Sequence, residues 1–488
     1  MAIIDWLVLP TIVFAQFAGT SLWFAPNAVI SQVGFDQDQV AALVSCVQAG
    51  FILGTLTLTY FTVADRFSPP ALFVLMTFAG AVLNAICIFT SSFPVWAFLR
   101  TVIGFTLAGV YPVGMKIAAQ EYPSGLGARL GVLVGALTLG TAFPWLVRGV
   151  GDSAGLPYEG TIAAVSVLAS VGAASMALVM IPRQGGPGAA CLRAILACCY
   201  DNERQEDSGK TSEHEGNKFT HSEGGCVTGS SVNVDIDIGQ SIGKSDIAVP
   251  VIEKQDTFNQ EADPNLSKGE RQGQKQLMGI QALRAILADS GFRAAAIGYF
   301  GHMFELYAFW AYVPNLIDSH ANEHGIVLGN VALTSFATIA VGAVSCALAG
   351  LWSLRAGRDI LPGSAVAAEV ALLISLVCCL LAPAYQYMSQ GVFLFYLLVW
   401  GSAVVADSAQ FSSLCAMYAC PSLVGTALTL TTCVGFAITI ISIQLIGALL
   451  KQGWSPGNAL ALLAIGPVIG TARSYKEWPL HKLCAGGE

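Results

Sequence analysis

Residues 70–90 read PALFVLMTFAGAVLNAICIFT, a stretch of 21 residues without a charged side chain. An α-helix rises about 1.5 Å per residue, so about 20 apolar residues are enough to cross the hydrocarbon core of a bilayer. The stretch therefore predicts a helix that spans a membrane.

The composition of the whole chain agrees with this reading. Of 488 residues, 55% are hydrophobic and 11% are charged, and the mean hydropathy is +0.65. A soluble domain carries about a quarter charged residues. This composition excludes a water-soluble protein. The net charge of −8 comes largely from one polar stretch, and no part of the chain is basic enough for a nucleic-acid partner.

Similar apolar runs occur along most of the chain and predict an all-α membrane protein with twelve transmembrane helices in two six-helix halves. The predicted spans are 5–30, 39–63, 70–90, 93–118, 127–149, 160–182, 292–317, 327–353, 361–383, 391–416, 424–450 and 456–473.

A polar interval separates the two sets of six. Residues 183–290 are rich in Gly, Ser, Glu, Asp, Gln and Lys, a composition that predicts a largely disordered loop. The hexapeptide LRAILA brackets it at 192–197 and 283–288, as expected of an inserted segment or of a gene-model artefact. The predicted division is an N-terminal bundle at 1–182, a central loop at 183–290, a C-terminal bundle at 291–475 and a tail at 476–488.

The orientation follows from the bias of Lys and Arg towards cytosolic loops. If the spans alternate, most basic loop residues fall on one side, which predicts that both termini and the central loop are cytosolic. These residues are Arg66, Lys116, Arg129, Arg355, Arg358, Arg473, Lys476 and Lys482.

Two short loops occupy the same ordinal position in the two halves. FTVADRFSPP (61–70) contains Asp65 and Arg66, and GLWSLRAGRD (350–359) contains Arg355 and Arg358 with Leu354 in place of the acid. Together they resemble the loop signature of the major facilitator superfamily of secondary transporters, a family built from a duplicated six-helix unit. The resemblance implies that these charges form a conformational clasp, with ordinary cytosolic loop charges as the alternative.

The predicted fourth span contains RTVIGFTLAG (100–109), which is similar to the family's Arg-x-x-x-Gly pattern. Arg100, Gly104 and Ala108 share one helical face, so a neighbouring helix can approach closely there. The resemblance also implies that the first, fourth, seventh and tenth spans line a central cavity. Polar residues concentrate on those four spans, and the candidate substrate and coupling residues are Gln16, Asn27, Arg100, Tyr111, Lys116, His302, Glu305, Tyr307, Asp407, Ser408 and Gln410.

Glu305 and Asp407 are the acids expected near the membrane midplane, and His302 lies three residues before Glu305. Ionisable groups are costly in a bilayer, and burial disfavours their charged form, which suits a proton carrier. For the two acids, a structural salt bridge or hydrogen bond is the alternative. For His302 alone, the structural role is the stronger reading.

The function expected is a secondary transporter, a symporter that moves a small polar solute by alternating access coupled to protons. An organic anion or a zwitterion is the favoured substrate. A drug or metabolite exporter or a uniporter is the rival within the fold, since an aromatic, weakly charged cavity would suit an exporter. A membrane receptor or scaffold is the alternative from another class. We expect no enzyme activity, cofactor or metal, and a monomer in the lipid bilayer.

Overall fold

The stretch that predicted a membrane span forms helix α5 (Pro69–Ile86) in the computed structural model. The Ser68 hydroxyl accepts a hydrogen bond from the Ala71 amide, and two prolines in the first turn suit a helix start. The structure describes residues 2–122, 126–181, 284, 286–324, 330–356, 362–420 and 423–478. Most of the central loop lies outside these ranges, and so do the predictions of disorder and of an inserted segment.

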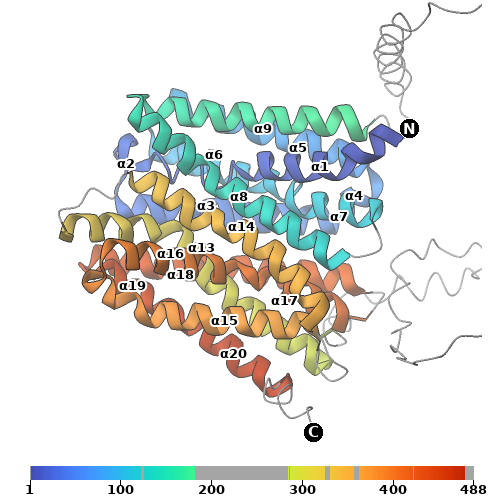
Figure 1. The fold of residues 1–488 in the computed structure, drawn as a ribbon. Coiled ribbons are helices and arrows are strands. Elements are labelled where there is room, and N and C mark those ends of the chain that lie inside the picture. Colours follow the sequence, from blue (N-terminus) through green and yellow to red (C-terminus); the bar gives the residue numbers. More distant parts are fainter. Residues whose placement is uncertain are drawn as a thin grey trace, which may run out of the picture. The chain divides into compact units, whose positions relative to one another are not determined.

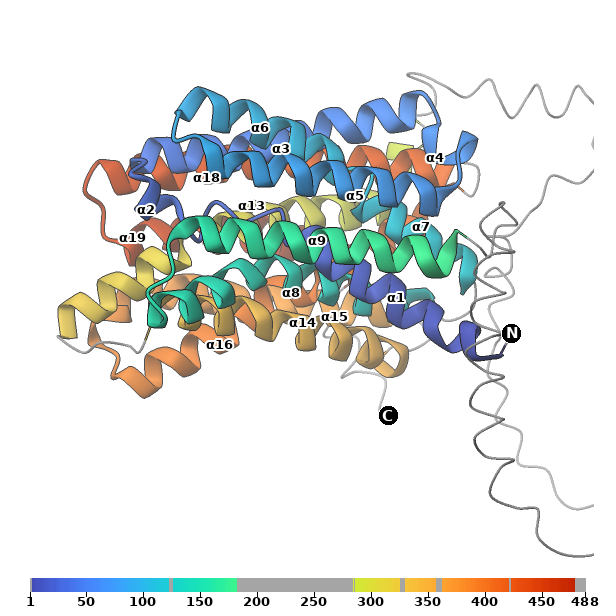
Figure 2. The same ribbon diagram turned by 90° about the horizontal axis from the view of Figure 1, so that it is seen from above.

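The first half of the chain contributes helices that run side by side in Figures 1 and 2. They are α1 (Ala2–Thr20), α2 (Ile30–Val33), α3 (Gln37–Tyr60), α4 (Val63–Arg66), α5, α6 (Phe93–Leu107), α7 (Tyr111–Glu121), α8 (Leu126–Ser153) and α9 (Tyr158–Met180).

The second half repeats this pattern within the same compact unit. Its helices are α13 (Ser290–His324), α14 (Val331–Ala356), α15 (Gly363–Leu381), α16 (Gln390–Ala406), α17 (Ser408–Tyr418), α18 (Val424–Lys451), α19 (Pro456–Ala461) and α20 (Ile465–Glu477), with 3-10 turns at Cys87–Phe89, Ala382–Tyr387 and Leu462–Ala464.

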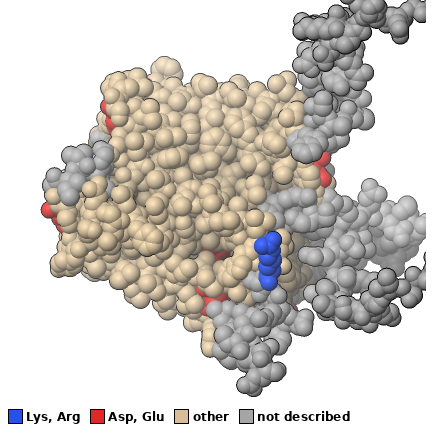
Figure 3. Space-filling view, in the orientation of Figure 1, with Lys and Arg blue, Asp and Glu red and all other residues tan. Residues whose placement is uncertain are grey.

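Within the described residues, nine helices are long and apolar enough to cross a membrane, and Leu7–Thr20 is a shorter apolar helix. The face shown in Figure 3 is almost free of charged side chains, and those that appear lie towards its edges. The twelve-helix prediction is consistent with this arrangement.

Four predicted spans are interrupted rather than continuous, which corrects their predicted bounds. The first ends as a helix at Thr20, and the fourth breaks between α6 and α7. The tenth breaks at Asp407, and the twelfth passes through a 3-10 turn. Pro112 lies in the first turn of α7, where its missing amide hydrogen costs no helical hydrogen bond, and Pro26 lies within the unwound segment of the first span.

The two halves meet through reciprocal helix pairs. Helix α3, the second span of the first half, packs on α18, the fifth span of the second half. Helix α8, the fifth of the first half, packs in turn on α14, the second of the other. This exchange of second and fifth spans is what two copies of one six-helix unit produce when they face each other.

The glycine expected to permit close packing does so. A Cβ atom on Gly104 of α6 would collide with the backbone of α3 at Val47 and Phe51. Small residues at such crossings let membrane helices approach through their backbones. The contact places Arg100, one turn earlier on α6, deep inside the first half, where its side chain is 1% exposed.

Candidate functional site

The first span unwinds between Thr20 and Ile30, and Arg100 holds the unwound segment. The Arg100 guanidinium donates to the Leu22 carbonyl oxygen at 2.9 Å and to the Trp23 carbonyl oxygen. Backbone without helical hydrogen bonds is tolerated at membrane depth only where other groups satisfy it. Arg100 therefore stabilises the break in the first span, and both of its terminal nitrogens, Nη1 and Nη2, already donate hydrogen bonds.

The segment that Arg100 holds carries aromatic side chains to the boundary between the halves. The Trp23 ring stacks on Phe436 of α18 with centroids 5.4 Å apart, and it contacts Tyr307 of α13 at 5.6 Å. Phe51 of α3 lies 4.4 Å from Phe436, and Phe24 meets Trp310 edge to face at 6.0 Å. We call these six residues, Trp23, Phe24, Phe51, Tyr307, Trp310 and Phe436, the aromatic seal.

Polar contacts join the halves towards the same end of the bundle. The Gln444 side chain donates to the Ser45 hydroxyl at 2.8 Å, and Lys451 forms an ion pair with Asp38. The Asn330 amide donates to the Gly149 carbonyl oxygen at 2.7 Å. The seal is therefore one part of a wider closure at this end.

A small cavity of about 20 Å³ lies directly against the seal. A space of this size holds about one water molecule. Its walls come from both halves, and three seal residues belong to them. The lining residues are Tyr111, Val134, Leu137, Tyr299, Met303, Leu306, Tyr307, Trp310, Val405, Ser408 and Phe436.

The breaks in the fourth and tenth spans deliver one residue each to this cavity. Tyr111 is the first residue of α7, and Ser408 is the first residue of α17. Both line the cavity, from opposite halves of the chain. Interrupted helices at matching positions of two repeats are the arrangement in which transporters place their binding sites.

A buried acid–base pair lies beside the cavity. His302 Nδ1 is 2.7 Å from Asp407 Oδ1, with side-chain exposures of 0% and 2%. The pair is within ion-pair distance, although the angles are poor for a hydrogen bond, and His302 Nε2 has no partner among the described residues. Met303 and Ser408, the residues that follow each member of the pair, line the cavity.

Glu305 lies elsewhere. Its Oε1 accepts hydrogen bonds from Ser375 Oγ at 2.5 Å, Trp400 Nε1 at 2.6 Å and Cys379 Sγ at 3.2 Å. These donors come from α15 and α16, inside the second half. The carboxylate is buried and well satisfied, and it does not line the cavity.

The periodicity of α13 explains why His302 and Glu305 separate. The cavity-lining residues Tyr299, Met303, Leu306, Tyr307 and Trp310 follow the spacing of one helical face. At about 100° per residue, His302 falls on the flank of that face and Glu305 falls on the opposite side. The helix therefore directs one group towards Asp407 and the other towards α15 and α16.

The remaining candidates of the first half do not converge on the cavity. Gln16 is fully buried, and a Cβ atom on Gly114 of α7 would collide with its side-chain oxygen, so it packs within the first half. Asn27 lies in the unwound segment with its Nδ2 atom buried and unpartnered among the described residues. Lys116 is half-buried on α7. In the second half, Gln410 is buried on α17.

The loop residues predicted to form a clasp are described only in part. The Arg66 Nε donates to the Thr62 hydroxyl at 3.1 Å within the same loop, and Arg355 is exposed at the end of α14. The Asp65 side chain and the whole of Arg358 lie outside the described residues. The clasp stays a prediction.

Several residues of the site were not among the predicted candidates. Phe51 and Phe436 complete the seal, Trp400 binds Glu305, and Tyr299 and Met303 line the cavity. The helical spacing along α13 was a signal for the last two. The aromatic residues of α3 and α18 carry no such signal, since an isolated Phe is typical of any membrane helix.

No group of three or more His, Cys, Asp or Glu side chains in the described ranges is placed to hold a metal ion. The site is thus made of one buried acid–base pair, hydroxyl groups and aromatic rings.

Solved structures of two transporters have a fold similar to that of this chain. The chain resembles a bacterial homologue of the human lysosomal transporter Spinster, solved in an inward-facing and unoccupied conformation, with a TM-score of 0.60 and 14% identity over 97% of both chains. It also resembles a point mutant of the nucleoside transporter NupG, with a TM-score of 0.60 and 12% identity over 97% of this chain and 99% of that one. These likenesses show the fold. No curated protein matches the sequence significantly.

The family model of the Major Facilitator Superfamily matches residues 8–443, which is most of the chain and both of its halves. With the reciprocal helix pairs and the two matching helix breaks, this match establishes the family. The chain is an integral, multi-pass membrane protein of the Major Facilitator Superfamily.

Proposed function

We propose that this protein is a proton-coupled secondary transporter that binds its solute at the cavity beside the aromatic seal. Membership of the family supports a secondary transporter. The observation that carries the rest is the position of the His302–Asp407 pair, since each member directly precedes a residue that lines the cavity. A proton gained or lost by the pair would act on the wall of the binding site.

The proposed cycle is alternating access. In this structure the seal and the polar contacts near it close one end of the path between the halves. The cavity has room for about one water molecule, so a solute enters only after the halves separate. Rocking of two repeats about a central site is the motion that such a duplicated fold favours.

The lining supports a solute with a flat apolar surface and few charges. Among the residues that line the cavity, none carries a formal charge, and the polar side-chain groups are the hydroxyls of Tyr111, Tyr299, Tyr307 and Ser408 and the indole N–H of Trp310. Arg100 and Glu305, the charges expected to attract an anion or a zwitterion, are each occupied elsewhere. We therefore favour a drug or metabolite exporter over a transporter of an organic anion or a zwitterion.

We also propose that the end carrying Arg66, Arg355, Arg473 and Lys476 faces the cytosol, with the termini and the central loop on that side. The support is the bias of basic residues towards this end of the bundle. A monomer is proposed as the working unit, because the cavity is lined from both halves of one chain.

The test is a solute screen on purified protein in proteoliposomes, with uptake and thermal stabilisation as the two readouts. We expect uncharged or weakly charged aromatic solutes to raise the melting temperature and to be transported. Tyr111→Ala should weaken this response, whereas the matched control Tyr60→Ala, an exposed residue at the end of α3, should not. A screen in which only organic anions or zwitterions bind would contradict the substrate class. If the protein moves no solute in either direction, the proposal that it is a transporter is wrong.

A further inference from the structure

Glu369 is a buried acid that the proposed cycle does not use. It lies on α15 and is 2% exposed. Ser375, which donates to Glu305, follows six residues later on the same helix, about 9 Å further along it. Within the second half, Glu369 therefore lies apart from the His302–Asp407 pair and from Glu305 and its hydrogen-bond donors.

Both carboxylate oxygens of Glu369 are buried without a hydrogen-bond partner of good geometry among the described residues. The hydroxyl of Ser474 on α20 is within hydrogen-bonding reach of the carboxylate but poorly aligned. Thr471 lies one turn earlier on α20, and its hydroxyl is also buried and unpartnered in the described part of the chain. Glu369 and Ser474 thus bring three unsatisfied oxygen atoms together from two helices.

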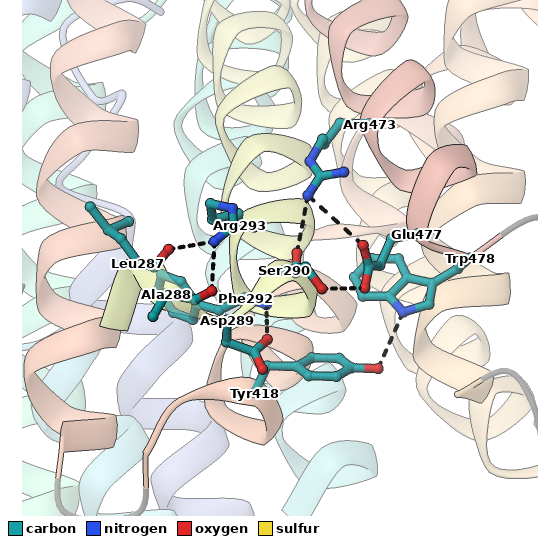
Figure 4. A network of polar contacts seen from close by, with 10 residues as sticks. All are labelled: Leu287, Ala288, Asp289, Ser290, Phe292, Arg293, Tyr418, Arg473, Glu477 and Trp478. Atoms are coloured by element: carbon teal, nitrogen blue, oxygen red, sulfur yellow. Dashed lines mark hydrogen bonds and ion pairs between the residues drawn. The ribbon is translucent and has the colours of Figure 1, made fainter. Parts of the chain in front are cut away.

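No base in the described ranges is a hydrogen-bond partner of Glu369. Arg473, next to Ser474, donates to the Ser290 carbonyl oxygen at 3.3 Å and lies 3.8 Å from Glu477, as Figure 4 shows. Ser290 in turn donates to Glu477 at 2.7 Å, so this network turns the guanidinium towards the start of α13.

Other titratable groups lie on the helices packed against α15, and none of them is a hydrogen-bond partner of Glu369. They are Cys346 and Arg355 on α14, Tyr396 and Asp407 at α16, Cys415 and Tyr418 on α17, and Arg473, Tyr475, Lys476 and Glu477 on α20.

The helices that carry the acid and the Ser474 hydroxyl pack closely against each other. A Cβ atom on Gly470 of α20 would lie 3.1 Å from Leu372 of α15 and 3.5 Å from the Gly298 Cα atom of α13. The three helices are therefore in close contact beside the acid. A buried carboxylate without a counter-charge is strongly unfavourable, so a small positive ion must accompany it.

We propose that Glu369 and Ser474 form a binding site for one small monovalent cation, a proton or Na⁺, separate from the His302–Asp407 pair. Carboxylate and hydroxyl oxygens are hard ligands that suit such an ion. The site lies between α15 and α20, outside the cavity, and its occupancy stabilises the contact between these two helices.

The experiment measures thermal unfolding of the purified full chain in detergent, which does not depend on any solute. Melting temperatures are compared between about pH 5 and pH 9 in choline chloride, and at the upper pH with increasing NaCl. Binding to the folded state alone raises the melting temperature. A rise with Na⁺ identifies sodium, and a rise on acidification without a Na⁺ effect identifies the proton.

Glu369→Gln should remove the Na⁺ effect or, for a proton site, the part of the pH dependence that Glu369 contributes. The matched control Glu477→Gln, an acid on the neighbouring α20, should retain it. The contribution of Glu369, taken as the difference between Glu369→Gln and the unmodified protein, should be the same in an Asp407→Asn background, which separates this site from the proposed coupling pair. If Glu369→Gln keeps the dependence of the unmodified protein, or if the unmodified protein shows none, the site does not exist.

Ser474→Ala keeps the acid and removes one ligand, so it serves if Glu369→Gln does not fold. Loss of a hydrogen bond to a charged group should raise the cation concentration needed for half of the stabilisation about tenfold. An unchanged concentration would overturn the proposal in the same way.

Discussion

His302 Nδ1 lies 2.7 Å from Asp407 Oδ1, and Asp407 is the residue at which the tenth span breaks into α16 and α17. The pair thus ties α13 to a helix break. A helix break is where a span bends most easily, because its backbone hydrogen bonds are already interrupted. Gain or loss of a proton by the pair would change this tie at the point where the cavity wall is formed.

The aromatic seal should depend on Phe436, which contacts three of its members: Trp23, Phe51 and Tyr307. Phe436→Leu should loosen the seal without the full loss of about 3–5 kcal/mol that Phe→Ala causes in a core. The expected result is a several-fold faster reaction of the buried Cys433, one turn earlier on α18, with a water-soluble maleimide, measured by peptide mass spectrometry.

Phe395→Leu is the control for this change, because Phe395 is 70% exposed on α16. An equal labelling rate at Cys433 in the two variants would show that Phe436 does not close the path.

Arg100 should act through the unwound segment of the first span. Lysine keeps the charge but lacks the planar fork that reaches two carbonyl oxygens, so Arg100→Lys should release Leu22 or Trp23. Backbone amides of residues 21–29 should then exchange with deuterium at least several-fold faster, while those of α9 should not change. Arg355→Lys, at an exposed arginine, is the matched control. Unchanged exchange at 21–29 would argue that Arg100 does not hold the break.

Glu305 should matter for stability more than for coupling. Glu305→Ala leaves the donors of Ser375, Trp400 and Cys379 buried without an acceptor, which should lower the free energy of unfolding by about 1–3 kcal/mol. Glu305→Gln retains an acceptor oxygen and should cost less. Chemical denaturation in detergent measures both variants. A Glu305→Gln protein that is fully stable but cannot accumulate solute would instead assign the coupling role to Glu305.

The loop prediction remains open to test. Asp65→Ala should slow transport several-fold more than Leu354→Ala, because only the first loop retains an acid at this position. Initial rates of solute exchange in proteoliposomes compare the two variants at equal protein density. Small and equal effects would remove the clasp from the mechanism.

The architecture could be predicted from the sequence because hydrophobicity and length decide whether a helix crosses a bilayer. The family resemblance was carried by short loops and by Gly104, whose contact with α3 confirms the expected close packing. The helix breaks at Thr20 and Asp407 could not be predicted, because unwound backbone requires partners from distant segments, such as Arg100. The helical spacing of α13 already places Glu305 opposite the cavity-lining face, so the sequence alone could have separated Glu305 from the site.

The central claim is that protons drive transport through the His302–Asp407 pair. The direct test is solute accumulation in proteoliposomes under an imposed pH gradient, with solute exchange at equal pH measured on the same preparation. Asp407→Asn should abolish accumulation and keep exchange, because the neutral side chain cannot cycle a proton beside the intact cavity wall. Accumulation by Asp407→Asn equal to that of the unmodified protein would contradict the account.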